Sequence, residues 1–233
     1  FLLKLDGDGN FISAIAIGGA NDDDVISMAV DRAGRPHLSG LFSGPVDFDP
    51  SPSVVTVEGQ TGGNFIAKYN TDGSLIWVKG FGVLYSGLYS SDIVVGSNNN
   101  VYVTGTHGYS PDFDPGPGVA TYPISYGVAL HIVKLNSQGK HFWSAVVSGS
   151  WGTSICIDSN ERLLVTGNGF GVPIDGDPGP GTLPLPAMSI PSSYMLAMNQ
   201  PAAAMPLDWI WTLIPVAGIA ALTLRRRKRP TAK

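Results

Sequence analysis

Three short segments of the sequence each carry two aspartates that are separated by one residue and followed at once by proline. The pairs are Asp47 and Asp49, Asp112 and Asp114, and Asp175 and Asp177. Because residues i and i+2 of an extended segment point to the same side, each pair places two carboxylates together. Carboxylate and backbone oxygens are the ligands that calcium prefers in proteins. The spacing therefore makes all six aspartates candidate ligands of calcium.

The same aspartates have a second interpretation, in which they shape the loops that contain them. Asp side chains accept hydrogen bonds from nearby backbone N–H groups, and they are common in turns that also contain proline and glycine. Two close carboxylates also suit acid–base catalysis, but a catalytic pair is seldom needed three times in one chain. The repetition favours the structural interpretation, and calcium binding stays open beside it.

The aspartate pairs belong to a unit that recurs every 62 to 66 residues. Matching positions carry the same residue in successive units, as for Gly40, Gly105 and Gly167, and for Lys4, Lys68 and Lys134. A fixed period of this length predicts a repeat architecture in which each unit packs against its neighbours. The recurring glycine lies at a strand end, which indicates a positive φ or a close approach of backbones.

Each unit is expected to form four β-strands. In the second unit we expect these four strands at residues 75–81, 92–96, 101–106 and 129–135, with an additional edge segment at residues 119–124. Val, Ile, Tyr and Trp dominate these segments, and Gly, Asn, Asp and Pro separate them. Because no segment before the C-terminal tail has a 3.6-residue period with helix caps, the sequence predicts an all-β fold.

The connection DGDGN contains a second calcium-like pattern at Asp6, Asp8 and Asn10. These positions match the opening of a calcium-binding loop. The corresponding connections in the next units, NTDGS and NSQGK, keep only Asp or Asn first and Gly fourth. That common part is the requirement of a tight turn, so a turn and a calcium loop both remain open for this segment.

The repeated units resemble the bacterial β-propeller repeats known as the SBBP family. The resemblance rests on the segments GGANDDDVISMAVDRAGRPHLSGLFSGPVDFDP, SSDIVVGSNNNVYVTGTHGYSPDFDPGPG and SWGTSICIDSNERLLVTGNGFGVPIDGDPGPG, and it covers about residues 1–199. It implies three propeller blades and part of a fourth, which form the C-terminal part of a larger propeller in an envelope or secreted protein. The period exceeds the roughly 40–50 residues usual for propeller repeats, so the region around DFDPGPG is expected to be an insertion.

Charge is distributed unevenly along the chain. All 18 acidic residues precede Trp209, whereas six of the 14 basic residues lie in the last nine positions. The body is therefore acidic, which does not suit a nucleic-acid partner, because nucleic acid needs a basic face.

The single cysteine and the four histidines carry no recognisable reactive motif. Cys156 lies in the apolar segment SICID and is expected to be a buried, inert thiol. The histidines have neither metal-ligand spacing nor matching repeat positions, and we expect them to be exposed or incidental: His37, His107, His131 and His141.

The C-terminal tail predicts a membrane segment. A linker at residues 200–206 leads into an apolar helix at residues 207–224, and a basic tail follows at residues 225–233. Residues 209–224 carry no charge, and at about 1.5 Å per residue they nearly span a bilayer core. Basic residues beside a membrane segment stay in the cytoplasm, which would place the propeller outside. The order of these parts also resembles bacterial C-terminal sorting signals, in which the tail is processed.

Together these features predict a non-enzymatic scaffold of the bacterial cell surface or envelope that binds protein or glycan. The chain would be anchored or sorted through its C-terminus. The alternative is a propeller hydrolase or lyase whose catalytic residues lie in upstream blades. A purely structural envelope protein without a ligand is a third interpretation.

Overall fold

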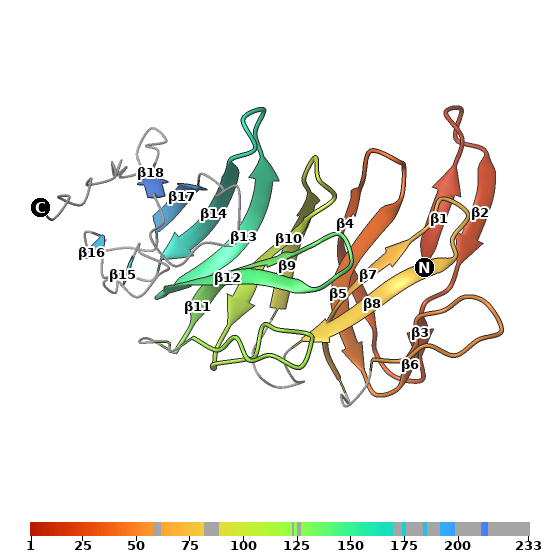
Figure 1. Cartoon of the computed structure of the whole chain (residues 1–233), viewed down its shortest axis with the longest axis horizontal. Coiled ribbons are helices and arrows are strands. Elements are labelled where there is room, and N and C mark those ends of the chain that lie inside the picture. The colour runs from red at the N-terminus through yellow and green to blue at the C-terminus, as the bar shows by residue number, and fades with distance from the viewer. Residues whose placement is uncertain are drawn as a thin grey trace, which may run out of the picture.

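The computed structural model of the chain describes residues 1–57, 62–81, 89–122, 124, 127–169, 174–175, 184–185, 192–198 and 211–213. These residues form β-strands, turns and loops and no helix, so the prediction of an all-β fold is confirmed. Most of the strands belong to three four-stranded antiparallel sheets that follow one another along the chain (Figure 1). The described residues do not form a closed ring of sheets.

Each sheet is a meander in which consecutive long strands are hydrogen-bonded neighbours. Sheet I contains β4 (Asp24–Val30), β5 (Pro36–Ser43), β7 (Gly62–Tyr69) and β8 (Leu75–Phe81). Sheet II contains β9 (Tyr89–Val95), β10 (Val101–His107), β11 (Ala129–Leu135) and β12 (His141–Ser148). Sheet III contains β13 (Ser150–Ile157), β14 (Leu163–Gly169), β17 (Ser192–Met198) and β18 (Trp211–Leu213).

Three two-stranded pairs complete the described structure. A hairpin of β1 (Leu2–Leu5) and β2 (Phe11–Ile15) precedes sheet I. The short strands β3 (Gly18–Gly19) and β6 (Val46–Asp47) pair with each other, as do β15 (Ile174–Asp175) and β16 (Pro184–Leu185).

The predicted strands are present except for one segment, but their grouping is wrong at one point: residues 75–81 form the last strand of sheet I, and β12 takes the fourth place in sheet II. Residues 75–81 and 129–135 form β8 and β11 as expected, and β9 begins three residues earlier than predicted. The additional segment at residues 119–124 is not a strand in its described residues. Its apolar residues Ala120, Tyr122 and Ile124 instead pack against a buried cluster as part of a loop. The apolar pattern of this segment therefore reflects burial without strand pairing.

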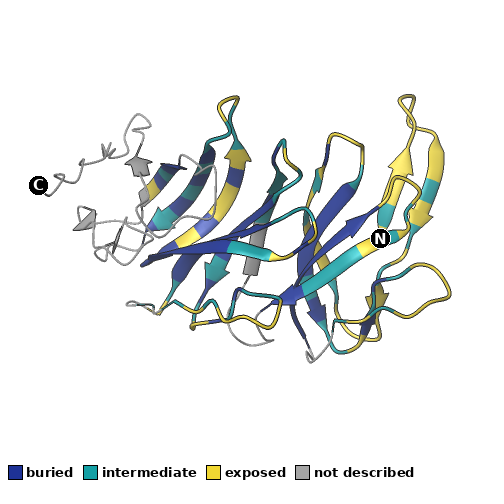
Figure 2. Ribbon diagram, in the orientation of Figure 1, coloured by how far each residue is buried: buried dark blue, intermediate teal, exposed yellow. Residues whose placement is uncertain are grey.

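Consecutive sheets pack face to face through shared apolar clusters. Ile66 and Phe81 of sheet I lie in one cluster with Ile93 and Val133 of sheet II. A second cluster joins sheets II and III, and it contains Leu130 and Ile155 among others. β11 is buried at every position because sheets I and III cover its two faces (Figure 2). β7 is also buried throughout, and its second face is covered by residues such as Leu2 and Ile15 of the β1–β2 hairpin.

Six hairpin turns have the same backbone geometry. In each, the N–H of the first residue donates to the carbonyl of the fifth, and the N–H of the fourth donates back to the carbonyl of the first. The fourth residue has a positive φ, which explains the recurring glycine of the turn sequences. The first residues of these turns are Asp6, Asp31, Asn70, Gly96, Asn136 and Asp158.

The turn at Asp6 uses its carboxylate for the turn itself. Asp6 Oδ1 accepts the backbone N–H groups of Asp8 and Asn10, and Oδ2 accepts the side-chain amide of Asn10. These bonds lower the pKa of Asp6, with the side chain and the backbone of Asn10 as the main causes. The geometry is that of the predicted turn, and a calcium ion at this segment stays a prediction.

The recurring glycines permit close backbone contact. A β-bulge in the first strand of each sheet lies opposite Gly40, Gly105 or Gly167. A Cβ on Gly40 would collide with the carbonyl oxygen of Asp24 across the bulge. None of these three glycines has a positive φ, so close approach is the reason for glycine here.

Cys156 is exposed, which corrects the prediction of a buried thiol. Its neighbour Ile155 points to the opposite face of β13 and is buried against sheet II. Side chains alternate between faces along a strand, so Cys156 lies on the face of sheet III that points away from sheet II. The apolar composition of the segment predicted a strand, but it did not indicate which face of that strand a neighbouring sheet would cover.

Most of the predicted linker, membrane helix and basic tail, at residues 200–206, 207–224 and 225–233, lies outside the described residues. The exception is β18, where three residues of the predicted helix form a strand that pairs with β17. No helix long and apolar enough to span a membrane occurs within the described residues.

Candidate functional site

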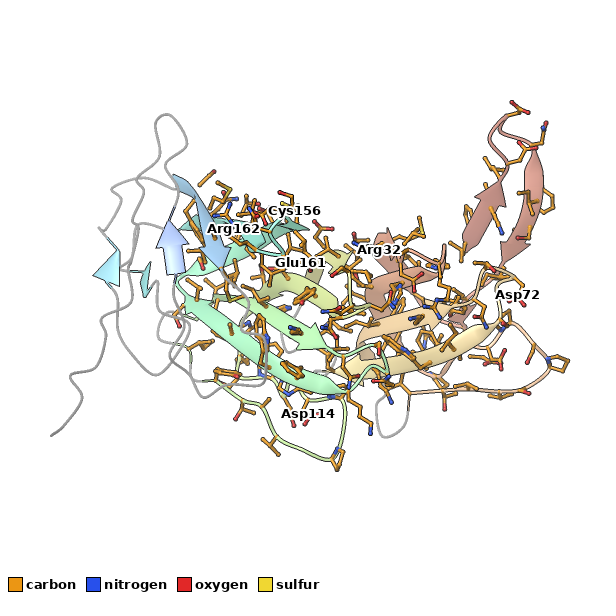
Figure 3. All side chains as sticks on the ribbon, turned by 45° about the horizontal axis from the view of Figure 1, so that its top comes forward. Arg32, Asp72, Asp114, Cys156, Glu161 and Arg162 are labelled. Carbon is orange, nitrogen blue, oxygen red and sulfur yellow. The ribbon has the colours of Figure 1, made fainter. Side chains whose placement is uncertain are left out.

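The strands of the stacked sheets end on two opposite sides of the molecule, here called edges, and these two sides differ in the loops they carry. In a four-stranded meander the first and third connections share one edge, and the second connection leaves from the other. The six tight turns therefore gather at one edge, here called the turn edge. The connections that contain the first two aspartate pairs lie at the opposite edge of sheets I and II, here called the loop edge (Figure 1). Asp114 lies at the loop edge, away from Glu161 and Arg162 at the turn edge (Figure 3).

The first aspartate of each described pair closes its loop through the backbone. Asp47 Oδ1 accepts the N–H groups of Asp49 and Val55, both at 3.0 Å. Asp112 Oδ1 accepts the N–H groups of Asp114 at 3.0 Å and Ala120 at 2.8 Å. The two loops thus have equal length and the same hydrogen bonds. The structural role that repetition suggested is present in both.

The second aspartate of each pair fixes the proline-containing tip. Asp49 Oδ1 accepts the N–H of Ser51, and Asp114 Oδ1 accepts the N–H of Gly116. Between the aspartates, Phe48 and Phe113 point into the molecule and are fully buried. The loops are therefore anchored by a buried ring and held in shape by two carboxylates each.

The calcium interpretation of these aspartates stays a prediction. One oxygen of Asp47, Asp49, Asp112 and Asp114 accepts backbone hydrogen bonds, as given above. Asp175 contributes backbone to β15, but the position of its side chain and all of Asp177 lie outside what the structure describes. Among the described residues, no three acidic, histidine or cysteine side chains converge as a metal site would require.

Replacing Asp112 by Ala is expected to destabilise the chain by about 1–2 kcal/mol, because two loop amides lose their acceptor. Replacing it by Asn is expected to cost less, since the Asn side-chain oxygen can accept the same bonds. Urea unfolding of both variants, in calcium and in a chelator, measures this. A bound ion would be supported if the free energies of unfolding of the original chain and the Asp112→Asn variant differed in calcium but not in the chelator. Equal losses for the Ala and Asn variants would contradict the loop-closing role.

The tips of the two loops expose matching apolar side chains. Val54 is 73% exposed and Val119 is 78% exposed, and they occupy the same position after Asp47 and Asp112. Single exposed apolar side chains are common on protein surfaces, but loops held by a rigid scaffold are where binding residues concentrate. The loop edge therefore presents the same apolar feature at least twice, at the spacing of neighbouring sheets.

No family model and no curated protein matches the chain.

A buried pair of histidines lies behind the loop of sheet II. His107 and His131 have no exposed surface, and their ring centroids are 5.5 Å apart. Phe113 contacts both, with centroid distances of 5.3 Å and 5.1 Å. None of the four ring nitrogens has a hydrogen-bond partner among the described residues. Burial lowers the pKa of His107 to about 4 and lowers that of His131 well below its ordinary value.

The equivalent positions in sheet I carry phenylalanine. Counting from the recurring glycine and lysine, His107 corresponds to Phe42 and His131 to Phe65. Phe42 and Phe65 flank Phe48 with centroid distances of 5.9 Å and 5.0 Å, as the histidines flank Phe113. The packing therefore accepts phenylalanine at this place, and the histidines of sheet II are not required by shape.

The prediction that the histidines are exposed is wrong for three of them. His37 is also fully buried, and burial together with the charge of Lys68 lowers its pKa to about 4. His141 is half-buried, with Nε2 2.6 Å from Ser144 Oγ. A signal for this was available, because His107 and His131 replace aromatic residues of the first unit at matching positions.

Asp92 joins the first strands of all three sheets. Asp92 Oδ1 accepts the hydroxyl of Ser27 on β4 at 2.8 Å, and Oδ2 accepts the hydroxyl of Ser154 on β13 at 2.6 Å. Oδ2 also accepts the N–H of Ile155 at 3.0 Å. The three residues occupy the same position in successive units, beside the β-bulge. Sequence reasoning missed this contact, although an acid in a position otherwise occupied by serine was visible.

Asp31 neutralises a buried lysine at the turn edge. Its side chain is fully buried and accepts the N–H groups of Ala33 and Arg35 as well as the Arg35 guanidinium. Lys68 Nζ lies 3.4 Å from Asp31 Oδ2 and is almost fully buried. Burial acts to raise the pKa of Asp31, but the bonds from Arg35 and Ala33 outweigh it and lower the pKa.

The matching lysine of sheet II is accommodated differently. Gly96 stands in the place of Asp31, and Lys134 Nζ lies over the rings of Tyr102 and Phe142 at 5.1 Å and 4.9 Å. Burial lowers the pKa of Lys134, and the charge of Glu161 opposes that shift. The recurring lysine is thus paired by charge in one sheet and by aromatic rings in the next.

Proposed function

We propose that the chain is a non-enzymatic scaffold whose loop edge binds a protein or a glycan. The observation that carries this proposal is the matching pair of exposed valines, each held on a loop that two carboxylates fix. An ordered loop loses little conformational freedom on binding, so its exposed side chains contribute more of their contact energy. Repetition in neighbouring sheets would let one ligand contact both tips.

The sheets are proposed to be blades of a β-propeller, which is a finer statement than an all-β fold. Three features support it: the four-stranded meander of each sheet, the shared apolar clusters between neighbours, and the contact of all three first strands at Asp92. First strands that touch one another are expected where blades converge on an axis.

The proposed location is the bacterial cell envelope, with the whole propeller outside and the basic tail in the cytoplasm. The support is the apolar segment 207–224 followed by basic residues, since such residues stay on the cytoplasmic side. Insertion of this segment into a membrane would remove residues 211–213 from sheet III, where they pair with β17 as β18. An acidic body without an internal disulfide is compatible with that location. Processing of the tail would release or re-anchor the chain.

Photo-crosslinking on intact cells tests the site and the location together. A photoreactive residue is placed at Val54, at Val119 or, as a control, at the exposed turn-edge residue Gln138. Adducts are expected from the two loop positions and not from position 138. Glycosidase digestion, which shortens an adduct with a glycan and leaves the chain itself intact, then distinguishes a glycan from a protein ligand.

Two outcomes would contradict the proposal. Equal adducts from all three positions, or none from the loop positions, would remove the loop edge as the binding site. Adducts that survive a protease that cannot cross membranes, and are digested only after lysis, would place the loops inside the cell.

A further inference from the structure

His107 and His131 project from the face of sheet II that is turned toward sheet I. In the register of β10 and β11, His131 lies opposite Gly105, two residues before His107, so both side chains lie on the same face. Val103 on that face belongs to the apolar cluster that joins sheets I and II. Both strands are hydrogen-bonded on both sides, and the sheet therefore holds the two imidazoles in fixed places.

The loop that follows β10 covers this pair. Its buried residue Phe113 contacts both imidazoles, with centroid distances of 5.3 Å and 5.1 Å. The loop is closed by the bonds to Asp112 and by the N–H of Phe113, which donates to the carbonyl of Ala120 at 3.1 Å. None of its described residues belongs to a strand. The loop can therefore lift from the imidazoles while the sheet stays intact.

The matching loop of sheet I provides an internal comparison. Phe48 is its buried anchor, and the N–H of Phe48 donates to the carbonyl of Val55 at 2.9 Å, which matches the bond made by Phe113. The anchor of this loop rests on Phe42 and Phe65. The two loops thus have the same closing bonds, and they differ in whether the anchor rests on groups that can take up a proton.

A protonated imidazole in this place would have no acceptor for its N–H groups among the described residues. His107 and His131 have no exposed surface, and their four ring nitrogens have no hydrogen-bond partner there. Burial of an unpaired charge is costly, and two imidazolium ions with centroids 5.5 Å apart would also repel each other. Water reaches both rings when the loop lifts. Protonation therefore favours the open loop.

Among the described residues, no carboxylate offsets this cost. The strands and the loop that supply buried residues to the surrounding cluster carry these other titratable groups: Lys68, Lys79, Asp92, Tyr109, Asp112, Asp114, Tyr122, Lys134 and His141. Burial alone lowers the pKa of His107, and at His131 burial is followed by the charge of His107, which lowers the pKa further. Asp114 and Asp112 act instead on His141, where they oppose the lowering of the pKa by burial.

We propose that His107 and His131 form an acid-sensitive latch, which holds the loop of Phe113 closed at neutral pH and releases it on acidification. The matching loop of sheet I stays closed over the same range. Because Val119 is the tip of the released loop, a ligand that contacts both tips would lose one of its two contacts in acid. That consequence rests on the proposed function, whereas the opening of the loop does not.

Hydrogen exchange of single backbone amides at pH 7.5 and pH 5 tests the latch in the full chain without a ligand. Each rate is divided by the rate of an unstructured peptide at the same pH, which gives a protection factor. For His107 alone, a pKa of about 4 in the closed loop and the ordinary 6.5 in the open loop raises the open fraction about 30-fold at pH 5. Protection of the Asp114 and Ala120 amides is therefore constant above pH 6.5 and falls about 30-fold or more at pH 5. The Asp49 and Val55 amides of the matching loop should keep their protection.

Two double variants exchange the residues beneath the loops. With His107→Phe and His131→Phe, the Asp114 amide should keep its protection at pH 5. With Phe42→His and Phe65→His, the acid sensitivity should appear at the Asp49 amide. The first variant places in sheet II the residues that sheet I already packs, so it gives a result even if the second variant does not fold.

The inference is overturned if the Asp114 amide of the original chain loses no more protection than the Asp49 amide. It is also overturned if the double phenylalanine variant loses as much protection as the original chain. Equal protection of the Asp114 amide and the Val133 amide of β11 at both pH values would mean that the loop opens only when the sheet unfolds, which also contradicts a latch. Because no ligand is present, this result is separate from photo-crosslinking at the loop edge.

Discussion

Acidification from pH 7 to pH 4 is expected to destabilise the chain by several kcal/mol more than it destabilises the double variant His107→Phe and His131→Phe. Both histidines are buried, and their pKa values lie below the ordinary value of 6.5, that of His107 at about 4. The unfolded chain binds protons below pH 6.5, whereas the folded chain does not until about pH 4. Stability is therefore unaffected above pH 6.5 and falls as the pH drops through that window.

The size of the effect follows from the same shift. For His107 a fall from 6.5 to about 4 corresponds to about 3 kcal/mol, and His131 adds to this in the same direction. Phenylalanine at both positions should be tolerated, because Phe42 and Phe65 fill the matching places in sheet I. Removing four unpartnered ring nitrogens should leave the variant at least as stable as the original chain at pH 8.

Urea unfolding of both proteins between pH 8 and pH 4 measures the difference. Carboxylates and the buried His37 titrate in both proteins. Only the difference in their free energies of unfolding therefore reports on His107 and His131. The difference should be flat above pH 6.5 and widen steadily below it. A difference that does not change with pH would mean that the two imidazoles are protonated as easily in the folded chain as in the unfolded one.

Replacing Asp31 by Ala is expected to cost about 3–5 kcal/mol, because it leaves the buried Lys68 without its partner. The turn also loses the acceptor of two backbone amides. The third unit provides a matched control. Asp158 makes the same bonds to Asn160 and Arg162, but Ala197 stands in the place of Lys68. Asp158→Ala should therefore cost less.

The comparison of Asp31→Ala with Asp158→Ala isolates the energetic effect of leaving the buried Lys68 without its carboxylate. Adding Lys68→Met to Asp31→Ala should recover part of the loss, since no buried charge then remains uncompensated. Unfolding of the four proteins by denaturant is the measurement. Equal losses for Asp31→Ala and Asp158→Ala, with no recovery by Lys68→Met, would mean that the turn alone accounts for the effect.

The strand pattern was predictable because it depends on local signals. Apolar alternation and the Asp, Asn and Gly of the turns occur in every unit, and they located β8 and β11 to the residue. The segment at residues 119–124 misled for a physical reason: Ala120 and Tyr122 are apolar because they cover a core cluster from a loop. A strand and a core-covering loop can have the same composition.

What depends on neighbouring units was harder to predict. The sequence shows that Cys156 lies in a strand, but only the stacking of sheets decides which face is covered. The histidines show the same dependence on neighbouring units, since His107 considered without the other units has no evident role. Comparison with Phe42 in the first unit would have indicated burial. The loop role of Asp112 was predictable from repetition, whereas the contacts of Asp92 join residues more than 60 positions apart.

Successive units stack as sheets whose first strands meet at Asp92. Double-mutant cycles test it most directly, with Asp92→Ala combined with Ser27→Ala and, separately, with Ser154→Ala. Each pair is expected to show a coupling energy of about 1–2 kcal/mol, whereas Asp92 and Ser193, which contacts Asn168 instead, should be additive. Additive losses for both Ser27 and Ser154 would contradict the stacked arrangement of the three sheets.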